Sequence, residues 1–316
     1  MVKRSGDHAF LRRDLYGTTP EPTYAGALSF MRRRYTRELD GVDLAVTGIP
    51  LDTATTKGPG ARFGPRAIRA ASATMAWERP YGMDFDPFDE LAVIDYGDCA
   101  FDFGRPETVP ETIERHALGI ISRGPGLLAI GGDHFVAFPL LRAHAEHHGA
   151  PLSLLHFDAH TDTWEDEDGR IDHGTMFWHA VQEGLIDPEH SVQIGIRTRN
   201  PDTLGFNVLD APYVHENGVD AVIDAARAVL GERPVYLSFD IDCLDPAFAP
   251  GTGTPVSGGL SSYQALAILR GLEGIDVIGG DVVEVAPAYD VGEITALAAA
   301  HIAMEIIGLY AAAGRD

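Results

Sequence analysis

The stretch Leu154-Leu155-His156-Phe157-Asp158-Ala159-His160-Thr161-Asp162 joins an apolar run to three polar side chains spaced two residues apart. Because side chains alternate across a β-strand, we expect Asp158, His160 and Asp162 to point the same way. Two carboxylates and an imidazole at that spacing repel one another or lose solvation unless a positive charge lies among them. A metal ion is the simplest such charge, so the stretch predicts a strand that ends at a metal site.

Two further apolar runs deliver the same kinds of side chain. The run Val235-Tyr236-Leu237-Ser238-Phe239-Asp240-Ile241-Asp242 ends in two carboxylates, and the run at 126–134 delivers a histidine just after its glycines. Several strands that end in metal-binding side chains suggest one shared site. The candidate ligands are six residues: His134, Asp158, His160, Asp162, Asp240 and Asp242.

The chain alternates between apolar strands and helices. We expect strands at 42–48, 91–95, from 127 onward, and at 152–158, 192–197, 235–241 and 276–280, and helices at 110–122, 134–148, 176–183, 219–230, 262–272 and 293–312. Continuous Val, Ile and Leu runs separated by helices are typical of an α/β fold with a parallel sheet covered on both faces. Ligands in such sheets bind at the carboxyl ends of the strands, where the six candidates fall.

The length of 316 residues allows one large domain or two, and the regular alternation favours one. We expect a single catalytic domain at 41–316, preceded by a segment at 1–40 that packs on the domain or on a neighbouring subunit. The chain has 24 basic and 47 acidic residues and a formal net charge of −23. This excess of acid argues against binding to nucleic acid or an anionic membrane and is compatible with a cationic ligand.

Cysteine usage and targeting signals favour the cytoplasm. Cys99 and Cys243 are the only cysteines, so the sequence offers no disulfide framework. No apolar core of signal-peptide length follows the basic residues near the N-terminus. We also expect no membrane-spanning helix, because no run approaches about 18 apolar residues. We therefore expect a soluble cytoplasmic protein.

Four carboxylates and two imidazoles exceed what one ion needs and suit two ions that share bridging carboxylates. Oxygen-rich ligation with some imidazole favours Mn²⁺ over Zn²⁺, although Co²⁺, Ni²⁺ or Fe²⁺ could substitute. Two ions about 3.5 to 4 Å apart can hold a bridging water, lower its pKa toward neutrality and present hydroxide to an electrophilic carbon. The expected reaction class is hydrolysis.

These motifs resemble those of the ureohydrolases, the manganese enzymes that include arginase and agmatinase. The likeness rests on Gly131-Gly132-Asp133-His134, on Asp158-Ala159-His160-Thr161-Asp162 and on the segment at 238–246. It extends over nearly the whole chain, and the segments at 172–177, 184–188, 247–255 and 281–287 make it greatest to the bacterial agmatinases. The resemblance implies a three-layer α/β/α sandwich with a mainly parallel eight-stranded sheet, two Mn²⁺ per subunit, and a homo-oligomer, often a trimer or hexamer.

The resemblance also implies roles for single residues. One Mn²⁺ would be bound by His134, Asp158, Asp162 and Asp240, and the other by Asp158, His160, Asp240 and Asp242, so that Asp158 and Asp240 bridge. Glu284 would hold the guanidinium of the substrate. His173 would contact the substrate and shuttle a proton to the leaving amine. Asp162 would also orient the bridging hydroxide.

The substrate expected from the resemblance is agmatine, cleaved to putrescine and urea in polyamine biosynthesis. The loop at 161–172 carries the acidic run Glu165-Asp166-Glu167-Asp168, and we find in it none of the Asn and Ser side chains with which arginase holds the α-carboxylate and α-amino group of arginine. Acids there would repel a carboxylate tail and tolerate an ammonium. The alternatives are a ureohydrolase acting on another guanidine, such as 4-guanidinobutyrate, and a non-catalytic metal-binding regulatory homologue.

Several other polar residues have structural interpretations. Asp133 is expected to be a helix N-cap or a hydrogen-bonding partner of a ligand, and Cys243 a small buried side chain. The histidine cluster, His144, His147 and His148, is expected to lie on a solvated helix face. The arginine cluster, Arg32-Arg33-Arg34, is expected at the surface or at a subunit contact.

Overall fold

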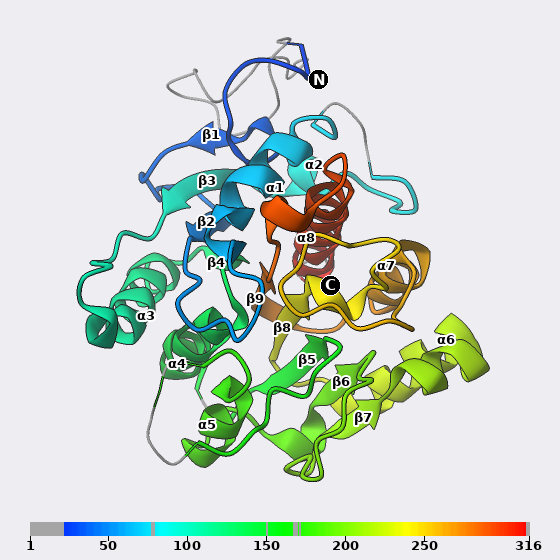
Figure 1. Cartoon of the computed structure of the whole chain (residues 1–316). Coiled ribbons are helices and arrows are strands. Elements are labelled where there is room, and N and C mark those ends of the chain that lie inside the picture. Colours follow the sequence, from blue (N-terminus) through cyan, green and yellow to red (C-terminus); the bar gives the residue numbers. More distant parts are fainter. Residues whose placement is uncertain (1–21, 77–79, 150, 167–169, 171, 314–316) are drawn as a thin grey trace.

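The computed structural model describes residues 22–76, 80–149, 151–166, 170 and 172–313. The strands are Arg34–Tyr35 (β1), Leu44–Ile49 (β2), Val93–Asp98 (β3), Gly126–Gly131 (β4), Ser153–Phe157 (β5), Val192–Ile194 (β6), Asn207–Leu209 (β7), Val235–Asp240 (β8) and Val277–Val283 (β9). They form one sheet in the order β1-β3-β2-β4-β9-β8-β5-β6-β7 (Figure 1). Every neighbouring pair in this sheet is parallel.

The expected parallel sheet is confirmed, but the expected number of eight strands is wrong, because the described sheet has nine. The strand runs predicted from apolar sequence correspond to β2, β3, β4, β5, β6, β8 and β9. The two strands that they omit, β1 and β7, have two and three residues and lie at the sheet edges. Neither strand contains a fully buried residue, so neither carries the apolar run by which strands are recognised.

Helices cover both faces of the sheet. The α-helices are Gly64–Ser72 (α1), Pro87–Glu90 (α2), Val109–Ile121 (α3), Ala137–His148 (α4), Met176–Gln182 (α5), Ala211–Leu230 (α6), Ser262–Gly271 (α7) and Ile294–Ala313 (α8). Single 3-10 turns lie at Phe30–Arg32, Ala61–Phe63, Pro106–Thr108, His134–Val136, Pro188–His190, Ile241–Cys243 and Pro287–Tyr289. The expected helix at 219–230 is the second part of α6, which begins earlier and is interrupted at Gly218 (φ 82°).

Two hydrophobic cores fill the spaces between the sheet and the two layers of helices. Helices α1, α6, α7 and α8 pack on one face, with Ile68, Val222, Ile268 and Ile302 in the core beneath them. Helices α3, α4 and α5 pack on the other face, where Ile113, Leu140 and Phe177 belong to the second core. Figure 1 shows the two helical layers on either side of the sheet. The predicted three-layer α/β/α sandwich is confirmed.

Helix α8 is a core element. Among the described residues it is the one helix long and apolar enough to cross a membrane, so the expectation that no run approaches that length is wrong. However, 72% of its apolar window is buried inside the fold, and the helix packs against α1, α7 and β9. Its buried Glu305 accepts a hydrogen bond of 2.8 Å from Nε of Arg270 on α7. These contacts identify an interior helix.

Two arginines of the cluster lie inside the fold rather than at the surface, while the side chain of Arg34 is 17% exposed. Arg32 and Arg33 are buried, which corrects the expectation for both. The guanidinium of Arg32 donates to the carbonyl oxygens of Pro22 and Ala25, and that of Arg33 lies 4.0 Å from the ring centre of Phe88. Burial lowers the pKa of Arg33 to about 10. The segment therefore packs its charges against carbonyl groups and an aromatic face.

The histidine cluster on α4 is divided between the core and the surface. His147 and His148 are exposed as expected, but His144 is 1% exposed, so its predicted solvated position is wrong. Its ring packs edge-on against Tyr236 of β8, with 5.1 Å between ring centres, and burial lowers its pKa to about 3. His144 follows Leu140 and Leu141 at helical spacing, which places it on the apolar face of α4.

Gly132 controls how the chain leaves β4. A Cβ at this position would overlap the carbonyl oxygen of Leu51. That oxygen also accepts the N–H of Asp133 at 2.8 Å, and the carbonyl of Gly132 accepts the N–H of Glu284 at 2.8 Å. The close approach thus fixes three backbone segments that meet beside His134.

We predict that Gly132→Ala lowers the free energy of unfolding by about 1 to 3 kcal/mol, because the added methyl must push two backbone segments apart. Urea unfolding followed by circular dichroism measures the change. Gly119→Ala is the matched control, since Gly119 lies within α3 and has nothing within 4 Å of an added Cβ. That control should raise the free energy of unfolding by about 0.5 to 1 kcal/mol. Equal stability of the two variants would contradict the role of Gly132.

Candidate metal centre

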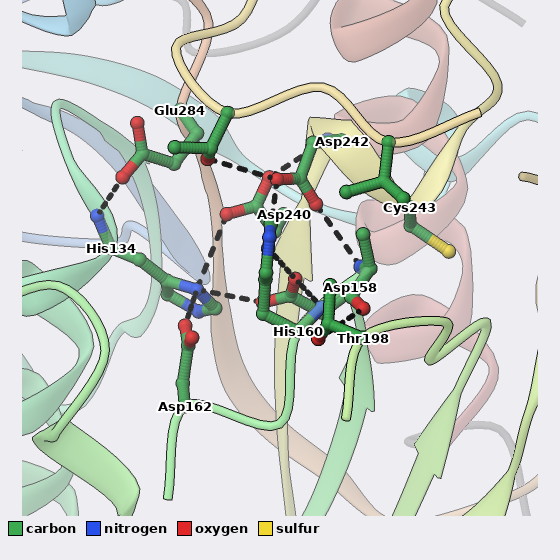
Figure 2. Close-up of polar contacts among 12 residues, drawn as sticks. His134, Asp158, His160, Asp162, Thr198, Asp240, Asp242, Cys243 and Glu284 are labelled. Carbon is green, nitrogen blue, oxygen red and sulfur yellow. Dashed lines mark hydrogen bonds and ion pairs between the residues drawn. The ribbon is translucent and has the colours of Figure 1, made fainter. Parts of the chain in front are cut away.

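All six candidate ligands meet at the carboxyl ends of three central strands. His134 follows β4, Asp158, His160 and Asp162 follow β5, and Asp240 and Asp242 lie at the end of β8 and just beyond it. Figure 2 shows their polar groups converging between the strand ends. Five of the six are buried, and His160 has 25% of its side chain exposed. Because the sheet is parallel, residues far apart in sequence reach the same edge.

The first group of ligands surrounds His134. Its Nδ1 lies 2.8 Å from Oδ2 of Asp162, 3.1 Å from Oδ2 of Asp158 and 3.3 Å from Oδ2 of Asp240. Three carboxylates therefore face one imidazole nitrogen, two from the segment after β5 and one from the end of β8.

The second group surrounds His160. Its Nδ1 lies 3.1 Å from Oδ2 of Asp242 and 3.3 Å from Oδ1 of Asp158. Asp158 thus presents one carboxylate oxygen to each group. Asp240 contacts the first group through Oδ2, while its Oδ1 accepts the N–H of Asp242 at 2.7 Å. Two neighbouring ligand sets that share a carboxylate have the form of a binuclear centre.

The electrostatics of the cluster call for cations. Nδ1 of His134 is buried and has no hydrogen-bond partner among the described residues, although three carboxylates face it. Burial, together with the charge of Asp158, raises the pKa of Asp162 to about 7. Burial and the charges of Asp242 and Asp158 raise the pKa of Asp240 well above its ordinary value. The residues fit a pair of divalent ions, because ions would satisfy the nitrogen and stabilise the ionised carboxylates.

A chain of hydrogen bonds orients His134. Tyr236 donates to Oδ2 of Asp281 at 2.6 Å, and Ser238 donates to Oδ1 of the same carboxylate at 2.7 Å. Because the proton of Ser238 is used in this way, its oxygen can only accept from Nε2 of His134, 2.8 Å away. This arrangement puts the ring proton on Nε2 and leaves the lone pair of Nδ1 facing the carboxylates, as a metal ligand requires.

Glu284 and His173 lie beside the first group. Oε1 of Glu284 accepts a hydrogen bond of 2.9 Å from the backbone N–H of His134 and lies 2.8 Å from Nδ1 of His173. Oε2 of Glu284 is buried and has no hydrogen-bond partner within the described part of the chain. This carboxylate oxygen is therefore, among the described residues, an unpaired acceptor beside the first ligand group.

His173 experiences two opposing influences. Although burial opposes protonation, the adjacent Glu284 raises the pKa of His173 to about 9. The backbone N–H of Thr56 donates to Nε2 of His173 at 3.0 Å, and this contact favours the neutral ring because an amide can only donate. The ring of His173 thus has a carboxylate at Nδ1 and a backbone donor at Nε2.

Asp162 and Glu284 have backbone conformations that are uncommon for residues with a side chain. Their φ angles are 52° and 62°, in the left-handed region. Such a conformation costs about 1 to 3 kcal/mol and persists where surrounding contacts impose it. The carbonyl of Asp162 accepts the N–H of Phe177 at 3.1 Å, and the N–H of Glu284 is held by Gly132. These bonds aim both carboxylates into the site.

A cavity of about 310 Å³ opens above the cluster. His160, Asp162 and His173 line this cavity, and so do Trp164, Glu165, Arg170 and Asp172. Of the acidic run at 165–168, Glu165 lines this cavity, while Asp166 is buried and accepts from the N–H of Arg170 at 2.8 Å. Glu167 and Asp168 lie outside the described residues. Two larger hollows, of about 470 and 590 Å³, are lined by none of the six ligands.

Sequence reasoning missed His156. Its Nε2 lies 2.8 Å from Oδ2 of Asp158, within the first group of ligands. Strand alternation was the available signal, because His156 precedes Asp158 by two residues and therefore faces the same side. Burial lowers the pKa of His156 to about 4.

Cys243 and Asp133 are sequence neighbours of the candidate ligands Asp242 and His134. Cys243 is fully buried, as predicted. Asp133 occupies the N-cap position of the turn at His134–Val136 but makes no side-chain capping bond there. Its Oδ2 instead accepts the N–H of Ala54 at 3.0 Å. Asp133 thus restrains the loop that follows β2.

Comparison with curated proteins finds relatives over nearly the whole chain. The chain is 59% identical over 305 residues to an agmatinase of Chromobacterium violaceum, covering 96% of this chain and 95% of the relative. It is 55% identical over 271 residues to an agmatinase of Neisseria meningitidis serogroup B, covering 85% and 88%.

Solved structures share the fold. A hypothetical agmatinase from Burkholderia thailandensis superimposes with a TM-score of 0.95 and 60% identity, covering 97% of this chain and 98% of that one. Proclavaminate amidino hydrolase from Streptomyces clavuligerus superimposes with a TM-score of 0.85 and 42% identity, covering 93% and 100%. Residues 42–308 match the Arginase family model. With its parallel sheet and the clustered His and Asp side chains at its edge, the chain belongs to the arginase family.

Proposed function

We propose that the protein is a binuclear manganese hydrolase that cleaves agmatine to putrescine and urea in polyamine biosynthesis. The observation that carries the proposal is the pair of ligand groups that share Asp158, next to the buried free oxygen of Glu284. The relatives named agmatinase, at 53 to 59% identity over most of the chain, support the same reaction.

The two ions would be held by the two groups. One would be bound by His134, Asp158, Asp162 and Asp240, and the other by Asp158, His160, Asp240 and Asp242. Contacts of Asp158 with both imidazoles support its bridging role, while the second contact of Asp240 rests on the likeness to the ureohydrolases. When bound, such a pair of ions supplies a nucleophilic oxygen at neutral pH and Lewis-acid stabilisation of charge.

The residues of the chain would hold the substrate and move protons. Oε2 of Glu284 would accept N–H groups of the guanidinium, which fixes the reacting carbon close to the ligand groups. His173, bonded to Oε1 of the same carboxylate, would deliver a proton to the departing amine. Asp162 would orient the attacking oxygen from the side of the His134 group.

The cavity lining favours a substrate whose far end is cationic. Glu165, Asp172 and the ring of Trp164 face the same hollow as the ligands. Carboxylates and an aromatic face attract an ammonium group. Arg170 is the one arginine or lysine among the described lining residues, and its Nε lies 3.6 Å from Oδ1 of Asp166, which offsets its charge.

A guanidine with a carboxylate tail, such as 4-guanidinobutyrate, is the second candidate. Arg170 lines the cavity and could turn toward a carboxylate if it left Asp166. The likeness to proclavaminate amidino hydrolase, at 42% identity, is compatible with such a substrate.

We also infer the setting of the enzyme. A homo-oligomer, trimeric or hexameric, in the cytoplasm is expected, with residues 41–316 as one catalytic domain and residues 1–40 packing on it or on a neighbouring subunit. The net charge of −23 favours a small cationic guanidine as partner over nucleic acid or anionic membrane.

The first prediction concerns substrate choice. Protein loaded with Mn²⁺ should release urea from agmatine with a kcat/KM at least about 10-fold above that for arginine or 4-guanidinobutyrate, because one charge contact near the surface is worth up to about 4 kcal/mol before desolvation. Urea release from the three guanidines in parallel, with a metal-stripped control, measures this. Preference for 4-guanidinobutyrate would favour the second candidate, and urea from none of them would refute the proposed reaction class.

The second prediction separates metal binding from substrate binding. Asp158→Asn should lower the content of both metal ions, since Asp158 contacts both ligand groups. Glu284→Gln should retain two Mn²⁺ per subunit and lose about 10- to 100-fold in kcat/KM, the value of one charge-assisted bond of about 1.5 to 3 kcal/mol. Metal analysis of dialysed protein, together with urea release, distinguishes them. Full metal content in Asp158→Asn would rule out the bridging role.

The third prediction concerns pH. Since burial raises the pKa of Asp162 to about 7 in the metal-free protein, protons compete with Mn²⁺ below that pH. Mn²⁺ affinity should therefore fall as the pH drops below about 7, with protons released on binding. Calorimetry at pH 6 in two buffers with different ionisation enthalpies measures the release. Asp162→Asn should release fewer protons, and binding without proton release at pH 6 would contradict the prediction.

A further inference from the structure

A second chain of hydrogen bonds reaches the ligand cluster from β6, whereas the chain that orients His134 comes from β8 and β9. Nε2 of His156 lies 2.8 Å from Oδ2 of Asp158, and Nδ1 of the same ring lies 3.0 Å from Nε2 of Gln193 on β6. The amide nitrogen of Gln193 also donates to the carbonyl oxygen of Thr161 at 2.7 Å. The side chains of His156, Asp158 and Gln193 are fully buried.

The donors and acceptors of this chain can be assigned in only one way. A carbonyl oxygen cannot donate, so the atom of Gln193 that faces Thr161 must be the NH₂ group. The second hydrogen of that group is then directed at His156, whose Nδ1 must accept it. A neutral imidazole that accepts at Nδ1 carries its proton on Nε2, and this proton points at Asp158.

We infer that His156 is a positioning residue for Asp158 and that Gln193 sets its tautomer. His156 lies close enough to Asp158 and His134 to be considered a ligand, but an Nε2 that bears a proton has no lone pair for a metal ion. Its N–H occupies one lone pair of Oδ2 and holds the carboxylate with one oxygen toward each ligand group. The inference rests on the proposed role of Asp158 as a metal bridge.

Gln193 also connects Asp158 and Asp162, two members of the first ligand group. Thr161, whose carbonyl it binds, immediately precedes Asp162, which has the left-handed backbone. The same amide therefore restrains Asp158 through His156 and Asp162 through the chain. Gln193 lies 37 residues from His156 and 32 from Thr161, so the connection forms only when β5 and β6 pair.

Mn²⁺ binding to the metal-free protein tests the relay without requiring turnover. His156→Phe keeps the ring and removes the donor, and it should weaken Mn²⁺ binding by about 10- to 100-fold. His156→Gln places an amide N–H near the position of Nε2 and should recover most of that loss. Gln193→Leu should also weaken binding, and the double variant His156→Phe with Gln193→Leu should lose less affinity than the sum of the two single losses, because Gln193 acts on Asp158 through His156.

A matched control and a direct measurement complete the test. Phe157→Leu alters the same strand on its other side, where Phe157 packs against Phe239, and should leave Mn²⁺ affinity unchanged. In protein labelled with ¹⁵N-histidine, the His156 ring should carry its proton on Nε2 both without metal and with Zn²⁺ as a diamagnetic probe. Loss of that proton on Zn²⁺ loading would show that His156 is a metal ligand. Fully additive losses of Mn²⁺ affinity in His156→Phe and Gln193→Leu would show that Gln193 acts independently of His156. Either result overturns the relay.

The failure of this inference can be told apart from failure of the proposed function. Metal affinity and the ring tautomer are measured without any guanidine. A protein that cleaves agmatine but shows a metal-bound Nε2 at His156 keeps its function and loses the relay. A protein that releases no urea from any guanidine still reports, through Mn²⁺ affinity, whether His156 positions Asp158.

Discussion

Repulsion among buried carboxylates is the constraint on which the rest of the site depends. Asp158, Asp162 and Asp240 all approach the same nitrogen of His134 within 3.3 Å, in a region with almost no solvent. Such an arrangement is unfavourable unless cations balance the carboxylates, and burial together with the charge of Asp158 raises the pKa of Asp162 to about 7. The fold holds the groups together because they lie at the ends of three fully buried strands, β4, β5 and β8, or in the segments that follow them.

The parallel sheet provides the rigidity that this crowding requires. Adjacent strands β4, β9, β8 and β5 end at the same edge, so ligands from three of them and Glu284 from the fourth meet without a long loop. Hydrogen bonds behind the ligands then fix ring orientation and tautomer. Asp281, which lies on β9, accepts from Tyr236 and Ser238 on β8 and so controls His134 on the far side of β9. The strands of the sheet thus position the ligands and also supply the groups that orient them.

The sequence predicts the centre of this molecule better than its periphery. The interior strands and the six clustered residues follow from apolar runs and a period of two, which depend on near neighbours only. Edge strand β7 lacks such a run, and β1 is recognisable only through its pairing with β3. Burial of Arg32 depends on carbonyl groups of Pro22 and Ala25, which local pattern does not reveal. His156 was within reach of the alternation rule, but its donor role depends on Gln193, far along the chain.

The segment before the first long strand has a practical consequence. Residues 42–308 match the family, yet Phe30 and Met31 belong to the core, β1 pairs with β3, and the N–H of Phe30 binds the buried carboxylate of Asp95. A truncated protein that starts at the family boundary would uncover an apolar surface and a free sheet edge, and Asp95 would lose a donor. Expression vectors for this enzyme should therefore begin upstream of Phe30, and affinity tags belong before that point rather than at residue 42.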